Sequence, residues 1–168
     1  IYDTSGYRPL VTQLTNYKSP LQNNDYKFVA IFFAANFLLL DGGRPGGKSS
    51  NSIIKMIMRL ALDYDYCHSH LKELLSAVQE GFIQWTYPVT SLELEEIYAV
   101  WESENQKYLQ TKRNYGKVFN KALKKGLYNN DPVLFSNTLK DTYGVPLNYT
   151  LQNLLDMGLI NSKSYNDC

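Results

Sequence analysis

The pattern of hydrophobic and polar positions divides the chain into helical segments joined by short polar or glycine-containing connections. The most apolar segment, YKFVAIFFAANFLLL, covers residues 26–40 and is rich in Ala and Leu, which favour a helix over a strand. Because it is apolar on nearly every side, it predicts a helix buried at the centre of the fold. The apolar run is shorter than the roughly 20 residues that a bilayer requires, so we expect no membrane partner.

A longer segment, residues 48–80, contains neither Gly nor Pro and repeats apolar residues at spacings of three and four. This spacing predicts one continuous helix of about 30 residues, roughly 45 Å long, with a heptad-like apolar seam. Ser50 or Ser52 is the expected N-cap, and Gly81 is the expected end. The residues of the predicted seam are Ile53, Ile57, Leu60, Tyr64, Cys67, Leu71, Leu74 and Val78.

After Pro88, a third long segment predicts a helix that starts at an N-cap on Ser91 and ends before Gly126. Gly116 lies inside it, at a point where the helix could kink or divide. Acidic residues fill the first half of this segment and basic residues fill the second.

Two shorter helices are expected near the C-terminus. Asp131-Pro132 is an N-cap followed by proline at the first helical position, and Gly144 closes that helix. The next helix is expected over about residues 147–157. The stretch from Thr138 to Ile160 resembles a helix-turn-helix, but its second helix carries no Lys or Arg, so a plain αα-hairpin is the expected structure.

Together these elements predict an all-α, single-domain bundle of five or six helices, with no strand and no internal repeat. A length of 168 residues fits one domain with its own core. The predicted organisation is an extended N-terminal arm at residues 1–25, a helical bundle at 26–160 and a tail at 161–168. The arm is rich in turn-forming residues, with one short helix after Pro9.

The charges of the chain nearly cancel, with 17 Lys and Arg against 16 Asp and Glu. This balance excludes a strong overall attraction to polyanions, so any contact with nucleic acid requires a local basic patch. Residues 107–125 form such a patch, with seven positive charges interleaved with Tyr108, Tyr115 and Phe119. Phosphate contacts together with base stacking on the tyrosines are typical of a nucleic-acid surface. The alternative is that the lysines solvate the helix and favour its dipole. The candidate binding residues here are Lys112, Arg113, Lys117, Lys121 and Lys124.

The glycine-rich stretch DGGRPGGKSS, residues 41–50, contains the G-x-x-x-x-G-K-S spacing of nucleotide phosphate-binding loops. Such loops follow a buried parallel strand, whereas the segment before Gly42 is predicted to be a helix. The stretch therefore predicts a connector between two helices. A weaker alternative is that Arg44, Lys48 and the following helix N-terminus bind a phosphate without hydrolysing a nucleotide.

Metal binding and catalysis are not indicated by the remaining polar residues. In DYDYCHSH, Asp63, Cys67 and His70 would share one face of a helix, but this mixed set suits zinc poorly without a distant fourth ligand. We expect no catalytic residue, no metal and no cofactor, and hence a protein that is not an enzyme.

Cys67 and Cys168 either form a disulfide or, more simply, remain free thiols in a reducing compartment.

The expected function is association. The first hypothesis is a capsid- or nucleoprotein-like helical structural protein that self-associates and contacts a nucleic-acid backbone through its basic surface. The alternatives are a protein-interaction or scaffolding module without nucleic acid and, less favoured, an anion- or nucleotide-binding protein that uses the Gly42–Ser49 loop. The expected partners are a second copy or another protein, together with nucleic acid. Because the chain starts with Ile1, we also expect a trimmed N-terminus.

Overall fold

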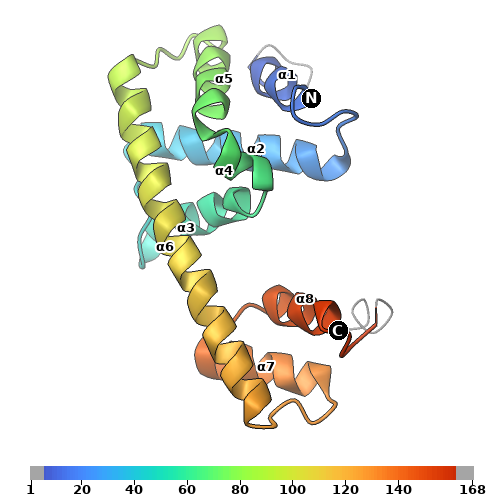
Figure 1. Ribbon diagram of the computed structural model, residues 1–168. Helices are drawn as coiled ribbons and strands as arrows, with labels where there is room; N and C mark the ends of the chain where they lie inside the picture. Colours follow the sequence, from blue (N-terminus) through green and yellow to red (C-terminus); the bar gives the residue numbers. More distant parts are fainter. Residues whose placement is uncertain (1–5, 162–168) are drawn as a thin grey trace. The chain divides into compact units, whose positions relative to one another are not determined.

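A computed structural model describes residues 6–161 of the chain, and these residues form eight α-helices (Figure 1). The all-α class is confirmed, whereas the predicted number of five or six helices is too low. None of the described helices is both long enough and apolar enough to cross a membrane. The helices are α1 (Arg8–Thr15), α2 (Asn23–Leu40), α3 (Ser49–Leu62), α4 (Asp65–Ser69), α5 (Leu71–Gln84), α6 (Ser91–Lys124), α7 (Pro132–Tyr143) and α8 (Leu147–Asp156).

The chain divides into two compact units, Ile1–Tyr108 (the N-terminal unit) and Leu109–Cys168 (the C-terminal unit). The boundary falls inside α6, which contributes its first half to the N-terminal unit and its second half to the C-terminal unit. Each unit has a separate cluster of buried hydrophobic residues. The single bundle predicted over residues 26–160 thus consists of two units.

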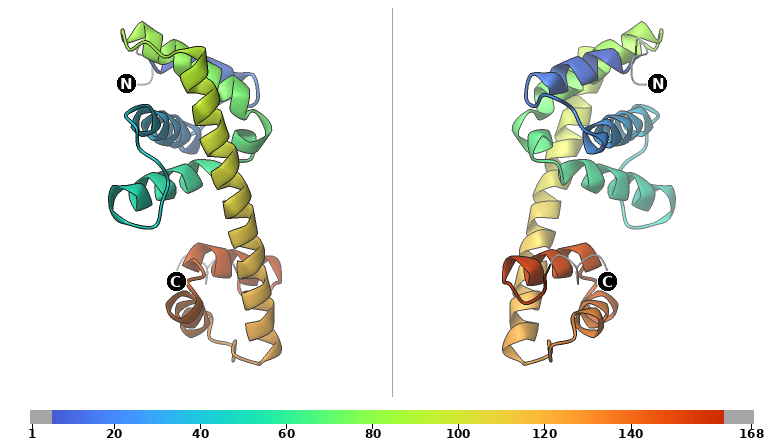
Figure 2. Two further views of the ribbon diagram at one scale, coloured as in Figure 1. Left: turned by 90° about the vertical axis from the view of Figure 1, so that its left-hand side faces the viewer. Right: turned by 90° about the vertical axis from the view of Figure 1, so that its right-hand side faces the viewer.

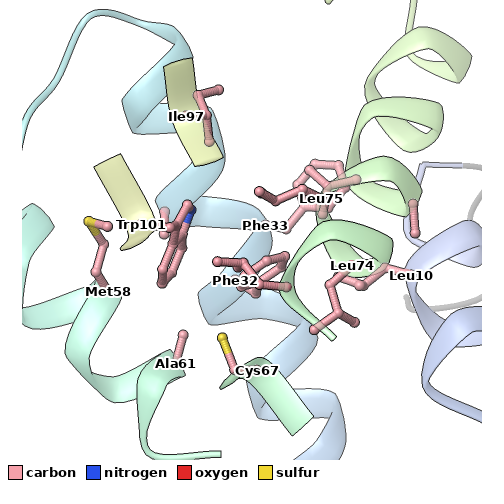
Figure 3. Close-up of a cluster of buried hydrophobic side chains, with 14 of the residues drawn as sticks. Leu10, Phe32, Phe33, Met58, Ala61, Cys67, Leu74, Leu75, Ile97 and Trp101 are labelled. Atoms are coloured by element: carbon pink, nitrogen blue, oxygen red, sulfur yellow. The ribbon is translucent and has the colours of Figure 1, made fainter. Parts of the chain in front are cut away.

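The core of the N-terminal unit is built around α2, as the apolar run predicts. Trp101 of α6 is fully buried, and its ring centroid lies 5.1 Å from that of Phe32. The indole Nε1 donates a hydrogen bond of 3.0 Å to Oδ1 of Asn36, whose Nδ2 donates to the Phe32 carbonyl at 2.7 Å. Figure 3 shows Trp101 lying between Met58 of α3 and Phe32 of α2. These hydrogen bonds give the buried indole N–H of Trp101 an acceptor and connect the Asn36 amide to the backbone of its own helix.

The long helix predicted over residues 48–80 is wrong, because the structure has α3, α4 and α5 in its place. The backbone leaves the helical conformation at Tyr64 (φ −90°, ψ 124°) and again at His70 (φ −133°, ψ 29°). This break allows the rings of Tyr64 and Tyr66 to pack against Phe28, at centroid distances of 5.2 and 4.9 Å. These are contacts to a distant segment, so the local spacing of apolar residues carries no sign of them.

The predicted apolar seam is also wrong at Ile53 and Leu60, whereas Ile57 and Tyr64 of the same seam do pack against the core. Ile53 and Leu60 are 54% and 46% exposed, whereas Ile54 and Met58 are buried. Because α3 carries apolar residues on two sides, the spacing alone did not identify the side that packs on α2.

Part of the predicted N-terminal arm belongs to the core. Leu10 and Leu14 of α1 are buried, and α1 lies alongside α5 (Figure 2). Gly81, predicted to end a helix, instead lies inside α5, where a Cβ atom would come within 2.1 Å of the Gly6 carbonyl oxygen. The glycine therefore permits a close approach between α5 and the chain that precedes α1.

A buried carboxylate connects the start of α2 to α4. Asp25 is 2% exposed; its Oδ2 accepts from the Gln22 backbone N–H at 2.7 Å, and its Oδ1 accepts from Lys18 Nζ and Tyr66 Oη, each at 3.2 Å. Loss of solvation opposes ionisation of Asp25, but these hydrogen bonds and the Lys18 charge outweigh it and lower the pKa of Asp25 below its ordinary value. Burial raises the pKa of Tyr66, with a further increase from its position beside Asp25.

The C-terminal unit consists of the second half of α6 with the hairpin of α7 and α8. The hairpin is confirmed: Asp131 accepts a capping hydrogen bond of 2.9 Å from the Leu134 N–H, and Gly144 ends α7 with a left-handed φ of 67°. The α6 helix passes through Gly116 without dividing, and its N-terminus is capped by Thr90 and Glu93 rather than by Ser91. The buried residues of this unit include Phe119, Ala122, Phe135, Leu139, Val145 and Leu154.

Replacing Gly81 with Ala should destabilise the N-terminal unit. Alanine favours a helix by about 1 kcal/mol over glycine, but the new Cβ would overlap the Gly6 backbone, and such overpacking costs about 1–3 kcal/mol. Urea unfolding followed by circular dichroism measures the difference. Gly47→Ala is the control, since a Cβ there meets no atom within 4 Å. Equal stability of Gly81→Ala and the wild type would contradict the close approach.

The Asp25 network predicts a pH-dependent stability. Because the pKa of Asp25 is lowered on folding, its contribution is present above the ordinary value of 3.8 and is lost as the pH falls through the lowered value. Asp25→Asn should therefore cost about 1–3 kcal/mol near pH 7, the scale of lost hydrogen bonds to a buried charge, and this cost should shrink in acid. Urea unfolding at a series of pH values tests this, with the exposed Glu96→Gln as control. A cost that does not vary between pH 7 and pH 2 would rule the network out.

Candidate nucleic-acid interface

The second half of α6 has one buried face and one basic face. Phe119 and Ala122 point into the core of the C-terminal unit. Four exposed cations recur on the opposite side at spacings of four, four and three, which places them on one face of a helix over roughly 16 Å. We call this set the α6 stripe: Arg113, Lys117, Lys121 and Lys124.

The cations of the α6 stripe are available to a ligand. Among the residues that the structure describes, none of the four forms an ion pair or a hydrogen bond with another side chain or with the backbone of a loop. Lys112, the fifth α6 residue singled out from the sequence, is half-buried, lies off this face and is engaged in an interaction of its own. The role of these five residues in binding stays a prediction.

The two units differ strongly in charge. The C-terminal unit has eight Lys and Arg against four Asp and Glu, a net charge of +4, whereas the N-terminal unit has nine against twelve, a net charge of −3. The net charge of +1 for the whole chain therefore conceals a basic unit. The near-neutral total, which weighed against nucleic-acid binding, does not describe the part of the chain that carries the stripe.

The aromatic residues of the basic segment serve the core rather than a stacking surface. Phe119 is buried, with its ring centroid 5.7 Å from that of Phe135, and the half-buried Tyr115 packs against Tyr149 at 5.6 Å. The covered ring of Phe119 is not available for stacking, and the expected stacking of bases on the tyrosines stays a prediction. What the face presents is positive charge, which suits phosphates.

The glycine-rich stretch is the connection between α2 and α3. Nη1 of Arg44 donates hydrogen bonds to the carbonyls of Leu39 (3.0 Å) and Gly43 (2.7 Å), so this side chain satisfies acceptors at the end of α2. Lys48 is exposed at the N-cap position of α3. A helix rather than a strand precedes the stretch, so the structural context of a nucleotide-binding loop is missing here. Both cations belong to the N-terminal unit, and the α6 stripe belongs to the other.

The polar cluster DYDYCHSH spans the break between α3 and α5, so its members do not share one helix. Cys67 is buried, which raises the pKa of its thiol to about 12, and the His70 ring stacks on Tyr17 at 3.8 Å. Over residues 6–161, no three His, Cys, Asp or Glu side chains come together as a metal site. Cys168, the other half of the considered disulfide, lies outside the described residues.

Sequence reasoning missed an arginine in the N-terminal unit. Nε of Arg59 on α3 donates to Oε1 of Glu104 at 2.7 Å, and the guanidinium carbon lies 5.0 Å from the centroid of the Tyr108 ring. Glu104 is 45 residues away along the chain. The only signal in the sequence is that Arg59 is a charged residue among the apolar residues of a helical segment. This signal does not identify Glu104 as its partner.

Comparison with known proteins finds similarity to alanine–tRNA ligases. The ligase of Endomicrobium trichonymphae is 28% identical over 134 residues, and those of Nitrosospira multiformis and Thermobifida fusca are each 26% identical over 137 residues. These matches cover 74–75% of this chain but only 15% of each ligase, so the chain spans about 15% of the length of these relatives. No family model matches the chain, and no solved structure matches it significantly.

The similarity to ligases contradicts the expected capsid- or nucleoprotein-like structural protein. The error has a physical origin. A helical protein that assembles with copies of itself and a helical segment of a large enzyme bury the same kinds of apolar face, so composition and periodicity do not separate them.

The hydrogen bonds of Arg44 predict a structural role for this residue. Arg44→Gln should lower stability by about 0.5–1.5 kcal/mol, because the carbonyls of Leu39 and Gly43 each lose the hydrogen bond from its guanidinium. Lys48→Gln, at an exposed neighbouring position, should change stability by less than about 0.5 kcal/mol. Thermal unfolding of both variants checks this difference, and a larger loss for Lys48→Gln would contradict it.

Proposed function

We propose that this chain is a tRNA-binding helical module, corresponding to a segment of an alanine–tRNA ligase, that contacts the RNA backbone through the α6 stripe. The observation that carries the proposal is the similarity, over three quarters of the chain, to enzymes whose name states that they join alanine to tRNA. The exposed cations and the net charge of +4 in the C-terminal unit support it.

The α6 stripe suits an RNA backbone in particular. Helical RNA has a deep and narrow major groove, so proteins contact it largely through phosphates and 2′-hydroxyls. A row of cations on a rigid helix provides several phosphate contacts without reading bases. Such binding is strongly salt-dependent, because each phosphate contact releases counterions.

The role that we propose for the chain itself is binding rather than ligation. The chain corresponds to about 15% of the ligases that it resembles, and its most distinctive surface is a row of cations. In this proposal the stripe holds the tRNA, and the joining of alanine takes place elsewhere.

The direct test is tRNA binding by a double variant, Lys117→Gln with Lys121→Gln. Its affinity should fall, and the slope of log K against log salt should decrease in magnitude by about 1 for each lysine that contacts a phosphate. Fluorescence anisotropy with labelled alanine tRNA, at several salt concentrations, measures both quantities. The matched control is Lys27→Gln with Lys72→Gln, which removes the same charge from exposed positions of the N-terminal unit.

Equal losses in the two double variants would show that only total charge matters and would remove the stripe from the proposal. Absence of binding by the wild type at low salt would overturn tRNA binding altogether. The same preparation is incubated with alanine, ATP and tRNA, and formation of alanyl-tRNA would overturn the binding-only role.

A further inference from the structure

We propose that Arg59 is a second RNA-contacting residue, which binds a backbone phosphate with the free edge of its guanidinium group. This inference rests on the proposed tRNA binding and adds a site in the N-terminal unit, separate from the α6 stripe. The site consists of Arg59 and Lys55 on α3, supported by Glu104 and Tyr108 on α6.

The guanidinium of Arg59 is held in one orientation by two contacts. Its Nε donates to Glu104, whose side chain is only 3% exposed, and its guanidinium carbon lies over the Tyr108 ring, 5.0 Å from the centroid. Tyr108 is itself fixed, because its hydroxyl donates to Oδ1 of Asp63 at 2.9 Å. An arginine held in this way loses little side-chain entropy when it binds a ligand.

Most of the donors of Arg59 are unused. A guanidinium has five N–H groups, and the one on Nε is the single group that bonds to Glu104. The four N–H groups on Nη1 and Nη2 donate no hydrogen bond to any residue that the structure describes, and the side chain is 21% exposed. Two parallel N–H groups on such an edge match two oxygens of a phosphate.

The carboxylates near Arg59 balance its charge but do not occupy its Nη1 and Nη2 groups. Glu104 neutralises the guanidinium, and Asp63 accepts from Tyr108. Lys55, one helical turn before Arg59, forms no ion pair with any described residue and adds a positive charge on the same side of α3. The two cations and the two carboxylates cancel in net charge, so the site attracts an anion through the directed N–H donors of Arg59 and the unpaired ammonium group of Lys55.

A purely structural Arg59 would serve only to neutralise buried Glu104. The two roles differ in what they require, because neutralisation needs one charged donor whereas phosphate binding needs the fork of N–H groups. A variant that removes the arginine and its partner together separates them, since replacing a buried ion pair with apolar residues often leaves stability unchanged or improved.

The experiment uses the full chain and labelled alanine tRNA. Arg59→Lys keeps the charge and removes the fork, and the double variant Arg59→Met with Glu104→Leu removes the ion pair while keeping the interface apolar. Both should bind tRNA about tenfold more weakly, the scale of one charge-assisted hydrogen bond. The double variant should also reduce the magnitude of the salt slope by about 0.7–0.9, as expected for one lost phosphate contact.

A second measurement uses the wild-type chain, so its result does not depend on whether the variants fold. Phenylglyoxal modifies accessible guanidinium groups, and mass spectrometry locates the modified residues. If the Nη groups of Arg59 bind a phosphate, bound tRNA should reduce the modification of Arg59. Arg44, whose Nη1 is bonded to backbone carbonyls, is the internal reference, because its modification should not change when tRNA binds. Equal modification of Arg59 with and without tRNA would overturn the inference.

The outcomes distinguish this inference from the proposed function. If the wild type binds tRNA and the stripe variant weakens binding, but the Arg59 variants bind like the wild type with an unchanged salt slope, then this inference alone fails. If the wild type does not bind tRNA, both fail. Loss of affinity in the Arg59→Met, Glu104→Leu variant with an unchanged salt slope would assign Arg59 to structural support and would also overturn the phosphate contact.

Discussion

The N-terminal unit depends on the burial of one tryptophan. An indole N–H inside a core needs an acceptor, and Asn36 on α2 provides it while donating to the Phe32 carbonyl of the same helix. With Met58 of α3 on the other side of the ring, Trp101 fixes α6 against both α2 and α3 (Figure 3). The buried apolar area of the Trp101 ring and its hydrogen bond to Asn36 together restrict the position of this side chain.

The same constraint determines the chemistry at the α3–α6 interface. Glu104 and Tyr108 follow Trp101 by three and seven residues, so they lie on the same face of α6. Once Trp101 is buried, Glu104 is buried with it, and its carboxylate needs a cation. Arg59 supplies that cation from α3, and the orientation that the ion pair imposes leaves its outer N–H groups unused.

The α6 helix also explains how a nearly neutral chain has a basic unit. Its first half carries acidic residues, one of which, Glu93, caps the N-terminus with Thr90, and hydrogen bonds from Thr90 lower the pKa of that carboxyl. Its second half carries the lysines, where they also favour the helix dipole. Because α6 belongs to both units, this arrangement gives the two units opposite net charges.

Local chemistry in the sequence was sufficient for the helical class, the buried α2 segment, the α7–α8 hairpin and the helix ends near Gly126 and Gly144. These features depend on neighbouring residues, through apolar periodicity, caps and left-handed glycines. The spacing of Lys117, Lys121 and Lys124 likewise places these three lysines on one face of a helix. By contrast, the break at Tyr64, the buried side of α3, the role of Gly81 and the pairing of Arg59 with Glu104 depend on contacts between distant segments. Local periodicity is the same whether or not those contacts form, and for that reason they emerged only once the chain was folded.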